Sequence, residues 1–243
     1  MIQVENIAKS FGAVQALRNI SFTAPDGLIT GILGPNGAGK TTTLRILYTV
    51  LKPDRGQARV DGLDVVTQPE EVKQRIGVLP DSRGLYPRLT GRENIRYYGR
   101  LHGLEEEILA HNITALVKLL DMENIAGRRA NGFSTGERLK VAIARSLIHN
   151  PQNVILDEPT NGLDVMSTRA MRDFICNLKE EGKCILFSSH VMQEVSAVCD
   201  QIVILAHGEV VMCGTPDEIR QVTGQDSLED AFVAAIGSEE GLK

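Results

Sequence analysis

Apolar and polar residues alternate near the start of the chain. The apolar positions of this stretch are Ile2, Val4, Ile7, Leu17, Ile20 and Phe22. Alternation with a period of two places every second side chain on the same face of an extended segment. The pattern therefore predicts short antiparallel strands at the beginning of the chain.

A compact apolar run over 28–33 predicts a buried strand that leads into a glycine-rich loop. After this loop, Leu44, Leu47, Val50 and Leu51 recur at helical spacing, and the breaker sequence 52–56 is expected to end that helix. Strand, loop and helix follow one another here.

From 85 to about 150 the pattern changes to helices. One predicted apolar stripe consists of Ile108, Ile113, Leu116, Leu119 and Leu120, and a second of Leu139, Ala142, Ile143, Ser146 and Leu147. Strands and helices then alternate: 154–156, 166–178, 185–187, 192–198 and 202–205. Such alternation is typical of an α/β fold with a mainly parallel sheet covered by helices, so the helical block is interpreted as an insertion.

Length and composition limit the function classes. The 243 residues suffice for one large α/β domain or a core with one inserted subdomain. A formal net charge of -5 disfavours a broad electrostatic grip on nucleic acid. No apolar run approaches the roughly 20 residues that span a bilayer, and the start shows no secretory signal. A membrane part would therefore be another chain. The four cysteines are expected to be small buried side chains in a reducing cytosol.

The glycine-rich loop carries the first candidate chemistry. It comprises Gly34, Pro35, Asn36, Gly37, Ala38, Gly39, Lys40 and Thr41. Its backbone N–H groups can surround phosphates, and the following helix adds its positive end. Lys40 supplies a charge for the β- and γ-phosphates, and the Thr41 hydroxyl can ligate Mg²⁺.

Two carboxylates follow the apolar segment 154–156. Asp157 is expected at the carboxyl end of a buried strand, where it can hold Mg²⁺. Glu158 points elsewhere and can orient or deprotonate an attacking water. An acidic turn before Pro159 is the alternative, which the upstream loop disfavours.

Three further positions have two interpretations each. Ser134 and Glu137 have the spacing of a capping box, and a helix start with the small Gly136 also suits a γ-phosphate. His190 follows an apolar strand; it is either structural or close to the γ-phosphate. Phe11 either stacks on an adenine ring or packs between strands.

Together these segments resemble the ATPase subunit of an ATP-binding cassette (ABC) transporter over nearly the whole chain. Residues 34–42, including Thr42, resemble the Walker A motif, 154–158 the Walker B motif and 161–164 the D-loop. His190 is similar to the family's switch histidine, Phe11 to its adenine-stacking aromatic, and Ser134 and Gly136 belong to its signature motif.

The resemblance implies a P-loop NTPase (RecA-like) core with a mainly parallel sheet, an N-terminal antiparallel β subdomain and an inserted α-helical subdomain. Residues 1–84 and 150–220 would form the core with the β subdomain, 85–149 the helical subdomain, and 221–243 a C-terminal tail. The resemblance also implies ATP and Mg²⁺ as ligands, with catalysis by Glu158 and His190.

The sequence departs from the family pattern at two motifs. The signature, usually Leu-Ser-Gly-Gly-Gln, is Phe133-Ser134-Thr135-Gly136-Glu137 in this chain. The Q-loop glutamine is replaced by Asp81, which loses a donor but keeps an oxygen for Mg²⁺ or for water.

Segment 81–90, the Ser-Thr-Gly signature and the tail sequence 228–232 resemble the NatA-type branch, which is associated with sodium export and has drug-exporting relatives. The resemblance implies a cytoplasmic homodimer at the inner face of the cell membrane, docked through the helical insertion near Tyr86 on a separate integral-membrane permease. Nucleic acid is not expected as a partner.

The mechanism that we expect is closure of a head-to-tail dimer by ATP, with Lys40 and Glu158 of one copy facing Ser134 of the other. The first alternative is a soluble cassette ATPase acting on the ribosome or DNA. Such relatives usually carry two cassettes or a long coiled-coil insertion, and this chain has neither. A small-molecule kinase does not explain the Ser-Thr-Gly-Glu segment, and a non-enzymatic binding module leaves Glu158 without a task.

Overall fold

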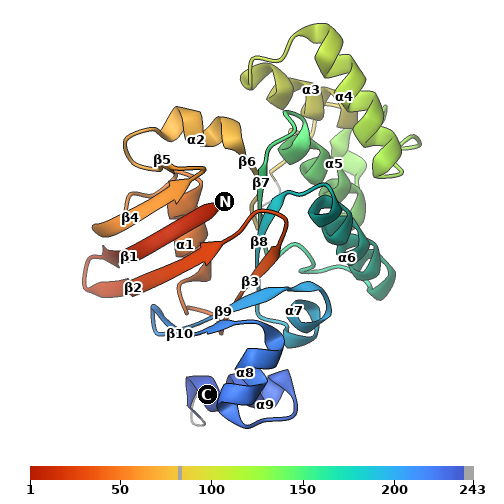
Figure 1. The fold of residues 1–243 in the computed structure, drawn as a ribbon. Coiled ribbons are helices and arrows are strands. Elements are labelled where there is room, and N and C mark those ends of the chain that lie inside the picture. Colours follow the sequence, from red (N-terminus) through yellow and green to blue (C-terminus); the bar gives the residue numbers. More distant parts are fainter. Residues whose placement is uncertain (82–83, 238–243) are drawn as a thin grey trace.

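The computed structural model describes residues 1–81 and 84–237. In these ranges the strands form one mixed sheet (Figure 1). Its strand order within these ranges is β5-β4-β1-β2-β10-β9-β3-β8-β7-β6. The strands are β1 (Ile2–Phe11), β2 (Val14–Ala24), β3 (Ile29–Leu33), β4 (Arg55–Val60), β5 (Leu63–Asp64), β6 (Ile76–Leu79), β7 (Asn153–Asp157), β8 (Cys184–Ser189), β9 (Gln201–Ala206) and β10 (Glu209–Gly214).

The sheet has a parallel part and an antiparallel part, as predicted. Strands β6, β7, β8, β3 and β9 pair in parallel, with Ile29 opposite Ile185 and Ile155 opposite Leu186. All five residues of β3 and all five of β7 are buried, because helices cover both faces of this part. Strands β1, β2, β4 and β5 pair antiparallel. β1 and β2 have 10 and 11 residues, so they are longer than the short strands expected.

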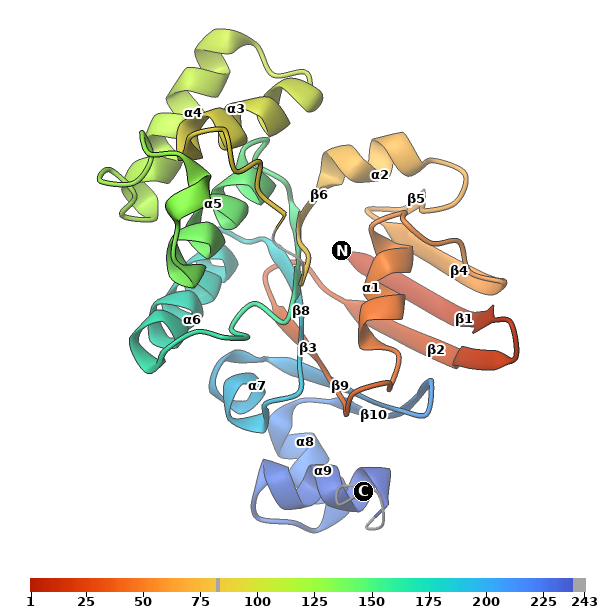
Figure 2. The same ribbon diagram turned by 180° about the vertical axis from the view of Figure 1, so that it is seen from behind.

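The helices gather in groups around the sheet (Figures 1 and 2). Helices α3 to α5 lie together at one end, α1 and α2 lie beside the antiparallel strands, and α8 and α9 lie at the opposite end. Their bounds are α1 (Lys40–Leu47), α2 (Pro69–Arg75), α3 (Gly91–Leu101), α4 (Glu106–Leu119), the 3₁₀ turn η1 (Ala130–Gly132), α5 (Thr135–Leu147), α6 (Val165–Glu180), α7 (Met192–Val198), α8 (Pro216–Thr223) and α9 (Leu228–Ile236).

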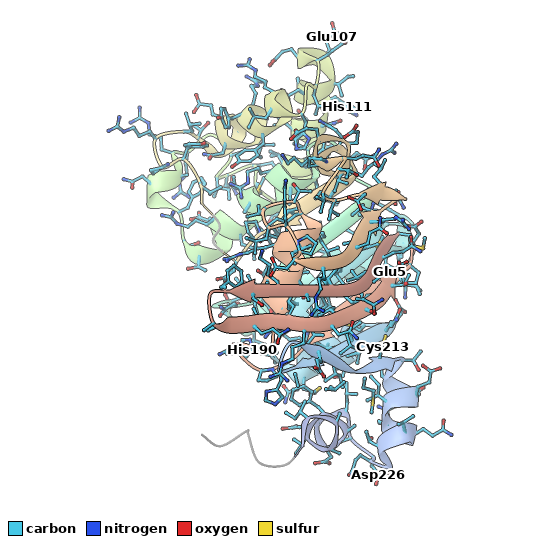
Figure 3. The ribbon with its side chains drawn as sticks, turned by 90° about the vertical axis from the view of Figure 1, so that its left-hand side faces the viewer. Glu5, Glu107, His111, His190, Cys213 and Asp226 are labelled. Carbon is cyan, nitrogen blue, oxygen red and sulfur yellow. The ribbon has the colours of Figure 1, made fainter. Side chains whose placement is uncertain are left out.

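The parallel strands divide the core into two apolar layers. On β8, Ile185 and Phe187 join the layer that includes residues of α3 to α7, while Leu186 joins the layer with α1 and the antiparallel strands. Successive side chains of a strand point to opposite faces, which explains this division. In Figure 3, Glu107 and His111 mark the outer end of the helical group, Asp226 marks the opposite end, and His190 lies between these ends.

Helix α1 ends earlier than the sequence pattern predicts. It stops at Leu47, Thr49 adopts a left-handed φ of 66°, and the N–H of Val50 donates to the Arg45 carbonyl at 2.9 Å. This is the geometry that terminates helices, and it precedes the predicted breaker segment 52–56. Val50 is therefore 67% exposed rather than part of the apolar face.

Two other expectations of burial are wrong in part. Ile108 and Leu119 on α4 are exposed, whereas the buried face of this helix contains Leu109, Ile113 and Leu116. Ile108 and Ile113 are five residues apart and cannot share one helical face, which explains the error. Cys213 is also exposed, because it lies on the outward-facing side of β10; Cys176 is half-buried, and Cys184 and Cys199 are buried as expected.

Parts of two predicted segments lie outside the described residues. These are Ser82 and Arg83, within segment 81–90, and residues 238–243, within the predicted tail 221–243. Across the described ranges, every helix is too short or too polar to span a bilayer.

Candidate active site

The glycine-rich loop connects β3 to α1, the context that a phosphate-binding loop requires. Gly39 is the residue before the helix and has a φ of 106°, in the left-handed region. A Cβ at this position would lie 2.5 Å from Leu17 Cδ2 and 3.0 Å from the Ala16 carbonyl oxygen. Glycine is therefore needed here both for backbone conformation and for space. The first N–H groups of an α-helix have no partners within the helix, so those of α1 are available to an anion held by this loop.

Lys40 is buried under this loop, with its side chain 6% exposed. Its Nζ donates hydrogen bonds to the carbonyl oxygens of Gly34 at 2.7 Å and Pro35 at 3.3 Å. The same Nζ lies 3.6 Å from Oε1 of Glu158. The ammonium group thus joins the loop to the end of β7, and it places a positive charge where a phosphate chain would pass.

Glu158 is held in an uncommon backbone conformation directly after β7. Its φ is 48°, in the left-handed region, and its N–H donates to Ser188 Oγ at 3.0 Å. Nδ1 of His190 lies 2.9 Å from Oε2 of Glu158. A bulky side chain at positive φ persists only when its surroundings fix it, and such positions concentrate at functional sites. The contacts with Lys40, Ser188 and His190 provide that fixation.

Asp157 is 2% exposed and lies at the carboxyl end of β7. Its Oδ1 accepts hydrogen bonds from Ser188 Oγ at 2.7 Å and from Thr41 Oγ1 at 3.3 Å. The carboxylate and the Thr41 hydroxyl therefore converge, although 116 residues separate them in the chain. Converging oxygens of this kind are suited to a hard divalent cation.

Most of the predicted nucleotide residues line one cavity, which we call the loop cavity, with a volume of about 710 Å³. The predicted residues on its wall are Phe11, Pro35, Asn36, Gly37, Gly39, Lys40, Thr41, Thr42, Asp81, Glu158 and His190. Gly34 and Ala38, which also belong to the loop, are buried and do not line the cavity. The cavity is large enough for a nucleotide, and its wall includes the aromatic ring of Phe11, the glycine-rich loop and the carboxylate of Glu158.

Two wall residues have further neighbours. The ring of Phe11 is at the end of β1 and is 47% exposed, with Lys9 Nζ 5.7 Å from its centroid. Asp81 follows β6 and also lines a second cleft of about 680 Å³, which lies between α1 and α2 on one side and α3 and α5 on the other. Asp81 thus borders both spaces, and the half-exposed ring of Phe11 borders the loop cavity.

Ser134 and Gly136 are not brought into the loop cavity. Ser134 caps α5: its Oγ accepts from the Glu137 N–H at 3.2 Å, and Glu137 Oε2 accepts from the Ser134 N–H at 2.7 Å. This is the capping box that the sequence predicts. The Ser134 N–H also lowers the pKa of the Glu137 carboxyl, with Arg128 as a second cause. Glu137, where the family usually has glutamine, is thus used by the helix cap.

The segment 161–164 leads from the loop cavity to the start of α6. Asn161 lies on the wall of the loop cavity. Asp164 caps α6, accepting at Oδ1 from the Ser167 N–H at 2.9 Å, and that N–H lowers the pKa of the Asp164 carboxyl. The segment therefore begins in the cavity and ends at a fixed helix start.

Sequence reasoning missed three residues that support the site. Ser188 bonds both Asp157 and Glu158, and Glu194 on α7 accepts hydrogen bonds from Thr160 and Ser189. Gly208 donates its N–H to the Ala38 carbonyl at 3.2 Å and supports the loop from the β9–β10 turn. Only Gly208 carried a recognisable signal: the pair His207-Gly208 between two apolar runs, 202–206 and 210–213, suits a tight hairpin turn.

Known proteins are similar to this chain in sequence and structure. The family described as ABC transporter matches residues 17–161. The ABC transporter ATP-binding protein NatA of Bacillus subtilis is 47% identical over 92% of this chain and 91% of its own length. The doxorubicin resistance ATP-binding protein DrrA of Mycobacterium tuberculosis is 34% identical over 98% of this chain and 75% of its own length.

A solved structure of an ATP-binding cassette has the same fold as this chain. It is a dimeric ATP-binding cassette in a post-hydrolysis state, bound to ADP and Pi. It superimposes with a TM-score of 0.80 and 26% identity over 88% of this chain and 98% of its own. These relatives favour a transporter subunit over the ribosome or DNA alternative. The chain belongs to the ABC transporter family, as an ATP-binding and ATP-hydrolysing subunit.

Proposed function

We propose that this chain is the motor subunit of an exporter and that each of its ATP sites is shared by two copies of the chain. This proposal rests on the separation of Ser134 from the other predicted ATP-site residues. Lys40, Glu158 and His190 line the loop cavity, while Ser134 is exposed at a helix start outside it. A second copy turned head to tail can bring its Ser134 and Gly136 to the open side of the cavity. The dimeric state of the related cassette supports this arrangement.

In each site the loop 34–42 holds the phosphates of ATP, and Phe11 stacks on the adenine. Lys40 carries the charge that faces the β- and γ-phosphates. The start of α5 from the other copy adds the N–H groups of a capped helix and the positive end of its dipole. ATP then contacts both copies, so it stabilises the closed dimer relative to the open one.

Mg²⁺ fits the converging oxygens of Thr41 and Asp157, with Asp81 contributing from the edge of the cavity. When bound, the ion neutralises charge on the β- and γ-phosphates. Asp81 lines both the loop cavity and the neighbouring cleft. A change at the nucleotide can therefore pass through its carboxylate to the helices that border this cleft.

Glu158 acts on the attacking water. One oxygen of its carboxylate faces Lys40 and the other faces Nδ1 of His190. These contacts fix the direction of the carboxylate, which orients the water and accepts its proton. His190 keeps Glu158 in place and contributes to binding of the γ-phosphate. Loss of the γ-phosphate removes the bridge between the copies, and the dimer reopens.

For the architecture of the complex, we divide the chain into a core with its β subdomain (1–84 and 150–220), a helical subdomain (85–149) and a tail (221–243). A homodimer of the chain docks on a separate integral-membrane permease at the cytoplasmic face of the membrane, through the helical subdomain near Tyr86. The drug-resistance role in the name of a relative supports export as the direction.

Mixing two inactive variants tests the shared site. Lys40→Ala removes the phosphate ligand of a copy, and Ser134→Arg obstructs the surface that it presents to its neighbour. In a mixed dimer, one of the two sites combines an intact loop with an intact Ser134. Random pairing of equal amounts makes half of the dimers mixed, so about a quarter of the parental ATPase activity is expected to return. If the mixture is as inactive as its components, the shared site is wrong.

A further inference from the structure

The loops that carry Glu158 and His190 are connected by the contact between these two side chains and, in the protein interior, by a second set of hydrogen bonds. Thr160 is two residues after Glu158, and Ser189 immediately precedes His190. The side chains of both Thr160 and Ser189 are turned into the protein, where Thr160 is 8% exposed and Ser189 is fully buried. The position of Thr160 therefore affects the backbone of Glu158, and the position of Ser189 affects the backbone of His190.

Both hydroxyl groups donate to the same oxygen atom. Thr160 Oγ1 lies 2.5 Å from Oε2 of Glu194, and Ser189 Oγ lies 3.0 Å from it. Ser189 Oγ in turn accepts from the N–H of Val191 at 3.0 Å. Glu194 is itself 9% exposed and lies in the first turn of α7. A buried carboxylate thus links the end of β7, through Thr160, to the end of β8, through Ser189.

We propose that Glu194 is a positioning residue for hydrolysis: it sets the separation of Glu158 and His190 by holding Thr160 and Ser189 at one oxygen. This inference rests on the proposed roles of Glu158 and His190. The Nδ1–Oε2 contact of 2.9 Å between them is made near the surface, where the His190 side chain is 45% exposed. A surface contact alone holds two side chains weakly, whereas the buried link fixes the backbone from which they project.

The chemistry of a carboxylate suits this task. An ionised carboxylate only accepts, so it can take both hydroxyl donors without bringing a donor of its own into the buried space. Glutamine keeps an accepting oxygen at the same distance but adds an NH₂ group that needs partners. Alanine leaves two buried hydroxyls without their acceptor and frees the two loops from each other. Misplacement of a catalytic group by about 1 Å can cost about 100-fold in rate.

A purely structural role is the competing explanation, because α7 also packs against β3, β8 and α9. In that case, removal of the carboxylate lowers stability but leaves the turnover of each folded molecule unchanged. The positioning role instead predicts a fall in kcat with little change in KM. It also predicts that Glu194 matters only while His190 is present to be positioned. These predictions differ, so kinetics and stability measured on the same samples separate the two roles.

The test uses the full chain and compares Glu194→Ala, Glu194→Gln and the control Gln193→Ala, whose side chain is exposed on the same helix. Melting temperature, ATP affinity, kcat and KM are measured well below the melting temperature. We expect Glu194→Ala to lower kcat about 10- to 100-fold with KM within about two-fold of the parent. Glu194→Gln should recover part of this loss, and Gln193→Ala should behave like the parent.

A double-variant comparison decides the mechanism. In the background of His190→Ala, the substitution Glu194→Ala is expected to lower kcat by less than about two-fold, because both changes remove the same arrangement. Losses that multiply in the double variant, or an unchanged kcat in Glu194→Ala, overturn the inference. If Glu194→Ala does not fold, Thr160→Val and Ser189→Ala remove the donors instead. The same fall in kcat is expected from them, and parental kcat in both overturns the inference.

Failure of the underlying site gives a different result. Parental turnover in Glu158→Gln and His190→Ala would contradict the proposed roles of those two residues, whatever Glu194 does. A loss of turnover in both, combined with parental turnover in Glu194→Ala, contradicts the positioning role alone.

Discussion

Nδ1 of His190 lies 2.9 Å from Oε2 of Glu158, and this contact joins the ends of two neighbouring parallel strands, β8 and β7. The other oxygen of the same carboxylate faces Lys40 Nζ at 3.6 Å. Glu158 is thus oriented from two sides, while its backbone is held by Ser188. A carboxylate with a fixed direction at the edge of the loop cavity is the arrangement that water activation requires.

Glu158→Gln should therefore lower kcat for ATP hydrolysis by about 10²- to 10⁴-fold, the range of general-base catalysis. The amide has the same size and keeps an oxygen toward Lys40 or His190, so ATP affinity should stay within a few-fold of the parent. Steady-state ATPase assays and equilibrium titration with a fluorescent ATP analogue measure the two quantities. A variant that hydrolyses ATP at the parental rate would remove Glu158 from this role.

Ser134→Arg should abolish turnover but leave binding of ATP to the monomer intact, because Ser134 lies outside the loop cavity. The control is Ser134→Ala, which loses the same helix cap without adding bulk. Loss of the cap costs about 1 kcal/mol of unfolding free energy. Nucleotide titration and ATPase assays on both variants separate obstruction from loss of the cap. The prediction fails if ATP affinity falls as much as turnover in Ser134→Arg.

Gly39→Ala should abolish ATP binding, because the added Cβ collides with Leu17 Cδ2 and the Ala16 carbonyl and so displaces the loop. Gly62→Ala is the matched control: Gly62 also has a positive φ, of 81°, but nothing lies within 4 Å of its Cβ position. Both variants carry backbone strain of about 1 kcal/mol. Only the first should lose ATP in the titration. Parental affinity in Gly39→Ala would show that the loop accommodates the methyl group.

The sequence predicted those parts of the site whose chemistry is local. The loop 34–41, the acidic pair after β7 and the capping box at Ser134 each lie within a few residues, so spacing alone reveals them. His190 was ambiguous, because a histidine at a strand end is often structural. The structure places it against Glu158, 32 residues away, a pairing that the order of the parallel strands decides.

Other features depend on contacts that no local pattern contains. Ser188 and Glu194 have partners about 30 residues away in the chain, so their roles emerge only when β7 and β8 pair. Local periodicity also overestimated α1, because the left-handed Thr49 ends it before Val50. It misjudged Ile108 as well, since α4 packs on one side only.

Stability should fall between pH 6.5 and pH 4 because of His149. Its ring stacks on that of His102 with the centroids 3.7 Å apart, and its Nε2 lies 3.0 Å from the Ile76 carbonyl oxygen. Burial, followed by the neighbouring His102, lowers the pKa of His149 from 6.5 to about 4. In this window the unfolded chain binds a proton that the folded chain excludes. Stability present above pH 6.5 is therefore lost as the pH falls, by on the order of 3 kcal/mol.

Urea denaturation at pH 7 and at pH 4.5 measures this dependence. Carboxylates contribute to it as well, so the informative quantity is the difference between the parent and His149→Gln. His149→Gln should show a smaller loss, whereas the control His111→Gln should match the parent, because the side chain of His111 is exposed on α4 (Figure 3). An equal loss in His149→Gln and the parent would assign the pH dependence to other groups.

The shared ATP site is tested most directly by the mass of Glu158→Gln in solution. Light scattering is recorded with saturating ATP and Mg²⁺, with and without the additional substitution Ser134→Arg, which serves as the control. If each site is shared by two copies, we expect a mass of twice the 26.5 kDa of the chain for the single variant and 26.5 kDa for the double variant. A mass of 26.5 kDa for Glu158→Gln at saturating ATP and Mg²⁺ would contradict the shared site.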